Sequence, residues 1–402
     1  GNHVLNNARS IYLAGTFFNY DPWKKIAASI IKIELPKLVT KDGFLREGSS
    51  HYQFLFTRWI LEVLYFSKIG NDERFTNYLS PYTNDLLNKC LFFSITNAYQ
   101  NLDIPLFGDI SPDFPPQWLN NLVNIYDLNH TQQNGVDNSW ANLINNAELN
   151  ICENIKYFNK MDYQGSGTYT YLKSGWYRFN YKNKILLMHA EPKGVSNHVG
   201  HQHHDAGHFC LYHNGFPVFV DSGRFTYSNS YGISPKAHNT IMVNKLGLVP
   251  DKPERYPLEY SNCCNSITSH EMGEVVFKSN GFSRLNRNIL WERKLNFSDN
   301  RFSIQDTVDG NGEYEVITYF HFNKDIKIKN KSNDVFLVSC HSFEAKLKID
   351  LQTPYSINIH FGGGSPLGWQ CVAYGNHVPA YTLEIVRKVE LPENTSLTME
   401  WV

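Results

Sequence analysis

Apolar residues recur at the three- and four-residue spacing of an α-helix up to about residue 155, and the pattern changes near residue 160. Short polar stretches separate the segments that show this spacing, which are residues 7–18, 23–35, 50–63, 79–99, 116–126 and 138–147. Successive amphipathic helices joined by short loops pack as antiparallel neighbours. The pattern therefore predicts a helical bundle, solenoid or toroid for residues 1–155.

Local start signals support two of these helices. Asp21 is a good N-cap and Pro22 suits the first helical position, and residues 23–35 then carry Ile26, Ile30 and Ile33 at helical spacing. Ser49 or Ser50 can cap the next helix, because a serine oxygen accepts hydrogen bonds from the unpaired first-turn amides.

Beyond residue 160 the chain reads as strands, the first two of them rich in Tyr, Thr and Trp, with Gly, Asn and Asp turns between the strands. The clearest are residues 168–172, 176–181, 185–190, 209–220, 302–307, 315–322, 336–339 and 355–361. Asp309-Gly310-Asn311-Gly312 predicts a hairpin turn. About ten or more strands predict a large antiparallel β-sandwich over residues 160–402. The fold class that we expect is α+β in two domains.

Composition narrows the functional classes. The 402 residues carry a net charge of −1, which provides no basic field for nucleic acid or for an anionic membrane surface. No apolar run is long enough to cross a bilayer, so we expect no membrane insertion. Seven cysteines, including the adjacent pair Cys263 and Cys264, do not form a disulfide framework. The compartment stays open, with the periplasm or secretion favoured over the cytoplasm, and a homodimer is one option.

The segment from residue 200 to residue 244 concentrates the chemistry. His201, His203, His204, Asp205 and His208 fall within eight residues. A strand-like run then ends at Asp221, and a polar loop closes at His238. Imidazole and carboxylate are ordinary Zn²⁺ ligands, so the second of these histidines, Asp221 and His238 could bind one ion. The alternative from spacing alone is a solvated histidine-rich loop.

This segment also resembles the heparinase II/III-like polysaccharide lyases. The family's GHxHxD, VDxG and HNT motifs correspond to residues 200–205, 220–223 and 238–240. Further similarity lies at residues 173–176, 305–321, 368–369 and 374–375. The resemblance implies an α/α toroid joined to an antiparallel β-sandwich, and a zinc ion held by His203, Asp221 and His238. One departure is that the family's Asn-His pair stands here at positions 2 and 3, so we expect a partial toroid that lacks upstream helices.

The resemblance also implies roles in substrate binding and catalysis. Asn2 and His3 would contact the substrate carboxylate, and an E-x-S-x-x-Y run that begins at Glu47 points to Tyr52 as a catalytic residue. Glu47 would either orient the site or cap the helix. His51 is expected to be a neighbour without a chemical role.

The histidine-rich segment would supply the other groups. If residues 201–203 form a strand, His201 and His203 face the same side, so that one reaches substrate while the other binds metal. Asp205 is expected to orient a histidine ring. Tyr231 maps to the loop tyrosine of the family, with Tyr227 as the competitor. Arg224 would pair with a uronate carboxylate, or lie in solvent as an ordinary loop arginine.

The function that follows is β-elimination on an acidic polysaccharide that contains uronic acid. Tyr52 would act as the acid toward O4, Tyr231 or His201 as the base at C5, and zinc mainly as a structural ion. A uronyl C5-epimerase, a non-catalytic glycan-binding or assembly protein and a metal-dependent hydrolase remain as alternatives. Heparan-type, alginate-like and bacterial surface polysaccharides all fit.

Overall fold

A computed structural model describes residues 1–96, 102–113, 163, 165–190, 200–249, 265–270, 273–286, 288–351 and 353–402. The chain forms two compact units. One comprises Gly1–Thr96, Leu102–Ile104 and Asp109–Tyr163, and the other comprises Asn97–Asn101, Pro105–Gly108 and Gln164–Val402. The helices predicted at residues 116–126 and 138–147, the boundary near residues 155–160 and the Cys263-Cys264 pair lie outside the described residues.

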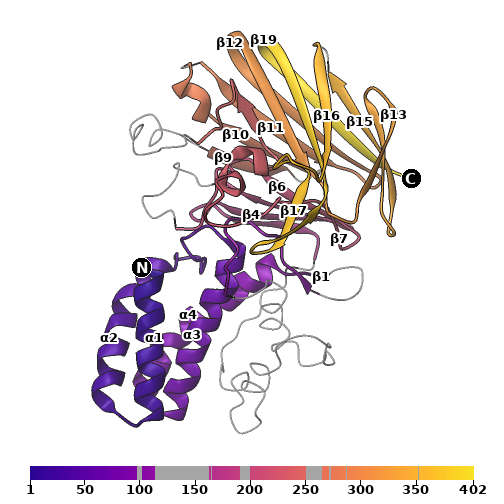
Figure 1. The fold of residues 1–402 in the computed structure, drawn as a ribbon. Coiled ribbons are helices and arrows are strands. Elements are labelled where there is room, and N and C mark those ends of the chain that lie inside the picture. The colour runs from indigo at the N-terminus through magenta and orange to yellow at the C-terminus, as the bar shows by residue number, and fades with distance from the viewer. Residues whose placement is uncertain are drawn as a thin grey trace. The chain divides into compact units, whose positions relative to one another are not determined.

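The described residues of the helical unit form two helical hairpins and a short two-stranded sheet (Figure 1). Its elements are α1 (Asn2–Phe17), α2 (Asp21–Leu38), α3 (Ser50–Ile69), α4 (Glu73–Phe93), β1 (Ile95–Thr96) and β2 (Leu102–Asp103). Gly15 lets α1 and α2 approach closely, because a Cβ at this position would lie 2.9 Å from the backbone nitrogen of Lys24. None of the helices in the described part of the chain is both long and apolar enough to cross a membrane.

Two predicted helix features need correction. On α2 the buried stripe is Ala27, Ile31, Leu35 and Leu38, whereas Ile26 and Ile33 are 56% and 59% exposed. The β-branched residues occupy two faces of this helix, so their spacing alone did not select the buried one. The helix predicted over residues 79–99 is α4, which begins at Glu73 and ends at Phe93, because Asp72 caps it and a short strand follows.

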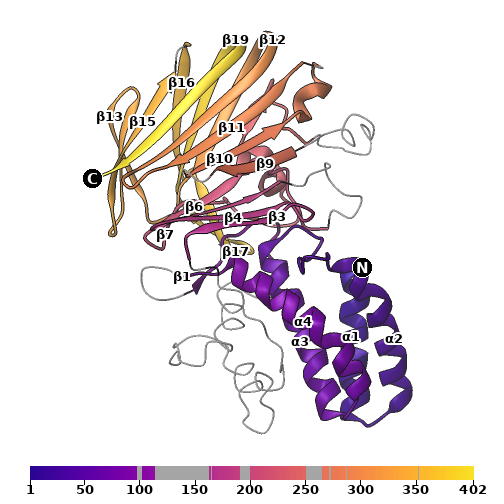
Figure 2. The ribbon, with the colours of Figure 1, turned by 180° about the vertical axis from the view of Figure 1, so that it is seen from behind.

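The second unit is built from antiparallel sheets (Figure 2). The larger sheet has the order β13 (Lys327–Ser332), β14 (Val335–Ser339), β15 (Glu344–Leu351), β19 (Tyr381–Trp401), β12 (Arg301–His321), β11 (Leu290–Phe297), β10 (Glu274–Ser279) and β9 (Asn265–His270). In addition, β16 (Tyr355–Phe361) pairs with β19, and β8 (Ile241–Val243) pairs with β12. The smaller sheet runs in order through β3 (Gly167–Tyr171), β4 (Trp176–Tyr181), β5 (Lys184–His189), β6 (Phe209–His213) and β7 (Phe216–Phe219). A separate hairpin consists of β17 (Trp369–Ala373) and β18 (Asn376–Pro379).

One apolar core joins the inner faces of the two sheets. Phe209 and Phe219 of the smaller sheet contact Phe302 of the larger one, and the rings of Phe219 and Phe322 are 4.8 Å apart. Aromatic side chains of this size dominate the burial energy of such a core. The predicted fold class, a helical region followed by a large antiparallel β-sandwich, is confirmed.

Two turns in this unit differ from the prediction. The run over residues 209–220 is a hairpin of two strands, because Asn214 and Gly215 adopt φ values of 53° and 72° that suit a tight hairpin turn. Conversely, Asp309-Gly310-Asn311-Gly312 does not reverse the chain. The strand β12 continues through it with a register shift between Val308 and Gly312, and the two glycines accommodate the bulge with φ values of 145° and 100°.

Candidate functional site

Three side chains from separate segments of the β unit converge on one point. His203 lies in the irregular loop before β6, Asp221 follows β7, and His238 stands between a short 3-10 helix (Pro235–Ala237) and β8. One potential ligand atom from each residue lies within 4.8 Å of the other two, and all three side chains are buried. The spacing along the chain, 18 and 17 residues, is bridged by the β6–β7 hairpin and by the tyrosine loop.

Residues 200–208 do not form a strand, so the premise that His201 and His203 share a strand face is wrong. The loop nevertheless separates them in environment, because His203 is buried and His201 is partly exposed. Asp205 is buried, and its Oδ1 lies 3.9 Å from Nδ1 of His189. Burial disfavours the charged form of Asp205, but the electrostatic attraction of the neighbouring imidazoles, above all His189, outweighs burial and holds the carboxyl pKa below its usual value.

Asp221 is the electrostatic centre of the group. Its Oδ2 lies 2.9 Å from Nδ1 of His238 and 3.3 Å from Nε2 of His208, and its Oδ1 accepts a hydrogen bond of 2.7 Å from the backbone N–H of Gly223. Burial opposes ionisation, but the neighbouring imidazoles outweigh it, and the pKa of the Asp221 carboxyl lies well below its usual range. Burial likewise lowers the pKa of His238, yet the charge of Asp221 reverses this effect and raises it.

The donor set fits a zinc ion. Two ligand atoms that each lie about 2.0–2.1 Å from one Zn²⁺ can be at most about 4.2 Å apart. The observed limit of 4.8 Å therefore requires only a small closure of His203, Asp221 and His238. Two imidazoles and one carboxylate in a buried setting are ordinary zinc ligands. The close polar neighbours of the Asp221 carboxylate are the imidazoles of His238 and His208 and the backbone amide of Gly223.

Asn239, the residue after His238, holds the surrounding strands together. Its Nδ2 donates to the carbonyls of Phe209 (2.8 Å) and Val220 (3.0 Å), and its Oδ1 accepts from the backbone N–H of His321 (2.7 Å). Its own backbone N–H donates to Nδ1 of His208 at 2.9 Å, which leaves the proton of that ring on Nε2, facing Asp221. Burial lowers the pKa of His208 to about 4, so the ring is neutral near pH 7. The motif containing Asn239 was recognised, but this role was not predicted.

The tyrosine loop is more enclosed than its sequence suggested. Tyr231 is buried at the start of a 3-10 helix (Tyr231–Ile233), and its hydroxyl donates to the carbonyl of Lys236 at 3.2 Å. Burial raises the pKa of Tyr231 well above its ordinary value. Arg224 is buried rather than solvated: its Nη2 donates to the carbonyl of Tyr227 at 3.3 Å, and its guanidinium lies 5.5 Å from the ring of the same tyrosine. Tyr227 itself is exposed.

In the helical unit, the structure brings Asn2 and Glu47 together. The side-chain amide of Asn2, at the start of α1, donates to Glu47 Oε2 at 3.0 Å. The N-cap of α3 is Ser49, whose hydroxyl accepts from the backbone N–H of Tyr52 at 3.1 Å, so Glu47 is not the cap. Tyr52 is buried in the first turn of α3, whereas His3 is exposed.

His51 serves the structure of the helical unit. It is fully buried, and its Nδ1 accepts a hydrogen bond of 2.9 Å from the backbone N–H of Ser111.

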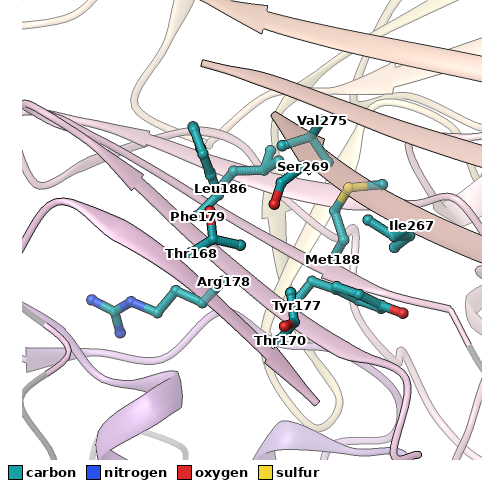
Figure 3. Close-up of a pocket in the computed structure, with 10 residues that line it drawn as sticks. All are labelled: Thr168, Thr170, Tyr177, Arg178, Phe179, Leu186, Met188, Ile267, Ser269 and Val275. Carbon is teal, nitrogen blue, oxygen red and sulfur yellow. The ribbon is translucent and has the colours of Figure 1, made fainter. Parts of the chain in front are cut away.

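A recess in the β unit lies apart from these groups. It is lined by residues of β3, β4 and β5 on one side and of β9 and β10 on the other, and Figure 3 shows the guanidinium of Arg178 directed away from the apolar side chains. Its empty volume is about 240 Å³ with open solvent included, which is below the range of ligand pockets. The recess contains none of the candidate site residues, so we interpret it as a gap in packing at the sandwich edge.

The sequence model described as "Heparinase II/III-like, C-terminal" matches residues 165–389, which is more than half of the chain. The chain belongs to this family. The resemblance expected from the GHxHxD, VDxG and HNT motifs is thereby confirmed.

Similar proteins include two curated heparin-sulfate lyases. That of Bacteroides thetaiotaomicron is 22% identical over 318 residues (71% of this chain and 41% of the relative), and that of Bacteroides stercoris is 21% identical over 395 residues (93% and 53%). Among solved structures, a heparinase III has a TM-score of 0.70 at 21% identity, and the heparan sulfate lyase HepC from Pedobacter heparinus has 0.68 at 17%. Both comparisons cover all of this chain and 60% of the other. The chain thus spans about half the length of the curated relatives, and at these identities the structural likeness shows the fold.

Proposed function

We propose that this chain acts as a polysaccharide lyase that cleaves a uronic-acid-containing polysaccharide by β-elimination. The observation that carries the proposal is family membership over residues 165–389 together with curated relatives named heparin-sulfate lyases. Those names make a heparan-type polysaccharide the first substrate class to test.

The reaction requires three kinds of group. A base removes the C5 proton, the electron pair of the C5–H bond forms the C4=C5 double bond, the C4–O4 bond breaks, and O4 takes a proton from an acid. The carboxylate at C5 resists the added negative charge, so donors or positive groups around it lower the barrier. We assign Asn2 and His3 to the carboxylate, and we leave out Arg224 because its side chain is buried.

The assignment of the base follows from pKa. A tyrosine serves as a base only where its pKa is lowered, but burial raises that of Tyr231. His201 is partly exposed, and imidazole is the side chain that most often acts as a general base. We therefore assign His201 as the base at C5 and give Tyr231 a role as a neutral hydrogen-bond donor. Tyr52 carries a phenol hydroxyl that can donate a proton, and we assign it as the acid toward O4.

The metal assignment rests on the donor set. His203, Asp221 and His238 would hold a zinc ion, and His208, whose Nε2 lies 3.3 Å from Asp221 Oδ2, would orient the carboxylate. When bound, the ion would supply positive charge and a fixed anchor for the loop that carries His201. The residues of the chain itself would move the protons.

The test is the ultraviolet absorbance of the 4,5-unsaturated uronate product over a panel of heparan-type, alginate-like and other uronic-acid polysaccharides. Tyr52→Phe is compared with Tyr65→Phe, which removes the hydroxyl of another buried tyrosine on the same helix. We expect the absorbance to rise with wild type and with Tyr65→Phe, and the rate of Tyr52→Phe to fall by about 10²–10⁴ as for loss of a general acid.

Other outcomes would redirect the proposal. Solvent deuterium that enters C5 of an uncleaved polymer would replace the lyase by a C5-epimerase. Measurable binding without any change in the polymer would favour a glycan-binding protein. Equal rates for the two tyrosine variants would remove Tyr52 from the chemistry.

A further inference from the structure

Among the described residues, the larger sheet contains two buried arginine–carboxylate pairs, and one of them contacts the backbone that carries the metal-ligand candidates. We propose that Arg293 is a positioning residue that sets the spacing between the loop containing His203 and the segment containing His238. This inference deepens the proposed function, because it rests on the assignment of zinc to His203, Asp221 and His238.

Arg293 on β11 forms a bidentate pair with Asp306 on β12. Its Nε donates to Asp306 Oδ1 at 2.7 Å and its Nη2 donates to Oδ2 at 2.8 Å, while the indole N–H of Trp291 also donates to Oδ1 at 3.1 Å. All three side chains are buried. The two parallel hydrogen bonds of this pair therefore fix the plane of the guanidinium.

The remaining nitrogen of the guanidinium connects two segments that are distant in sequence. Nη1 donates to the carbonyl of Gly207 at 3.0 Å and also to the carbonyl of Asn239. Gly207 directly precedes His208, whose Nε2 faces Asp221, and Asn239 directly follows His238. A single nitrogen thus holds both segments at one spacing, although they lie 86 and 54 residues from Arg293 along the chain.

The local packing shows that this approach is tightly fitted. Gly207 adopts a φ of +77°, and a Cβ at this position would lie 2.5 Å from a ring carbon of Trp291. The loop can reach Arg293 only because glycine adopts this backbone conformation and leaves room for the indole. The guanidinium itself lies 5.0 Å from the ring centre of Trp291.

Stability alone does not account for this arrangement. Burying an ion pair costs desolvation energy that its attraction only partly offsets, so apolar residues of similar volume are often as stable. Metal binding places a stricter demand on geometry than stability does, since zinc ligands must lie within about 0.2 Å of their bonding distances. Lysine cannot replace the planar fork of arginine, because its ammonium lacks the fixed bidentate geometry.

The second pair provides a matched control. Arg387 on β19 donates to Glu393 at 2.6 Å and to the hydroxyl of Thr318 at 2.9 Å, and both members of this pair are buried. These contacts involve none of the residues that carry or flank the metal-ligand candidates. Arg387→Lys should therefore disturb the sandwich as a buried-pair substitution does, without acting on the metal centre.

The experiment compares Arg293→Lys with Arg387→Lys in the full chain. Zinc affinity is measured by competition with a chromogenic chelator, and thermal stability is measured on the zinc-free proteins. We expect Arg293→Lys to weaken zinc binding by about 10–100-fold, as for other residues that orient metal ligands, and Arg387→Lys to leave it within about threefold. Amide hydrogen exchange in the zinc-free proteins should be faster at residues 204–209 and 238–240 in Arg293→Lys only.

Equal zinc affinities and equal exchange in the two variants would overturn the inference and leave Arg293 as a structural residue. If Arg293→Lys does not fold, Asp306→Asn compared with Glu393→Gln gives the same test with a smaller change of shape. A wild-type chain that binds no zinc would refute the metal assignment and this inference with it. Zinc binding with the expected contrast in a protein that cleaves no polymer would refute the lyase proposal alone.

Discussion

Asn239 offers the sharpest test of how the candidate metal centre is held. Its side chain makes three hydrogen bonds, all to buried backbone groups: the carbonyls of Phe209 and Val220 and the N–H of His321. These groups stand at the first residue of β6, immediately before Asp221, and at the end of β12. Asn239→Ala removes all three hydrogen bonds, and alanine can adopt the same backbone conformation.

The size of the effect follows from the unpaired groups. Each buried backbone donor or acceptor that loses its partner costs about 1–3 kcal/mol, and some of this cost is recovered if water enters the space left by the amide. Three such groups give an expected loss of about 3–6 kcal/mol in the free energy of unfolding of the β unit. A loss of this size is at the upper end for a single substitution, and it should also weaken zinc binding because the strands beside Asp221 separate.

The assay is urea denaturation of the zinc-free protein, followed by the fluorescence of tryptophans and by amide exchange in β6 and β12. Because the chain has two units, the transition of the β unit must be resolved from that of the helices before a free energy is assigned. Asn358→Ala is the control, since Asn358 is exposed and its side-chain amide donates one hydrogen bond, to Glu384 at 3.1 Å. A loss below about 1.5 kcal/mol, or one equal to that of the control, would refute the reasoning.

Two further predictions concern pH and metal. Burial lowers the pKa of Lys89 in the helical unit to about 8, so the folded state releases this proton before the unfolded state does, and stability should rise as the pH increases from about 8 to about 10.5. Lys89→Met should therefore raise the thermal midpoint at pH 7, and it should raise the free energy of unfolding by at most about 3 kcal/mol. This stabilisation should shrink toward pH 10, and a stabilisation that does not change with pH would contradict the reasoning. Zinc at about 100 times its dissociation constant should stabilise the β unit by about 2.7 kcal/mol, and chelation should reverse the effect in a calorimetric scan; unchanged transitions would contradict the metal assignment.

Much of the fold followed from hydrophobic periodicity, and the differences have identifiable causes. The strand at Trp176–Tyr181 was predicted with its observed bounds, because an aromatic-rich run that lies between Gly175 and Lys182 leaves little choice. The tight turn at Asn214-Gly215 was overlooked within an apolar run. Asp309–Gly312 was read as a turn, but glycines with positive φ also serve bulges, and only pairing with the long strand β19 decides between the two.

The candidate site was likewise predicted only in part. His203, Asp221 and His238 could be chosen from residue type, spacing and family resemblance, and the structure brings them together. Arg293 could not be chosen, because its role depends on carbonyls 54 and 86 residues away and backbone carbonyls carry no sequence signal. The burial of Arg224 was missed for a related reason, since a polar loop does not reveal which of its charges the surrounding strands will cover.

The position of the metal-ligand candidates within the β unit has a thermodynamic consequence. The smaller sheet is joined to the larger one at this point: Phe219 bridges to Phe322, and the backbone N–H of Val220 donates to the carbonyl of His321 at 3.0 Å. On the other side of the ligand set, the N–H of Tyr319 donates to the carbonyl of Thr240 at 3.0 Å. An ion bound by residues on both sides of this junction would stabilise the contact between the two sheets. By thermodynamic reciprocity, a substitution that loosens this contact would weaken metal binding by the free energy that couples the two. Selection for metal binding would then act on buried polar residues of the sandwich as well as on the ligands themselves.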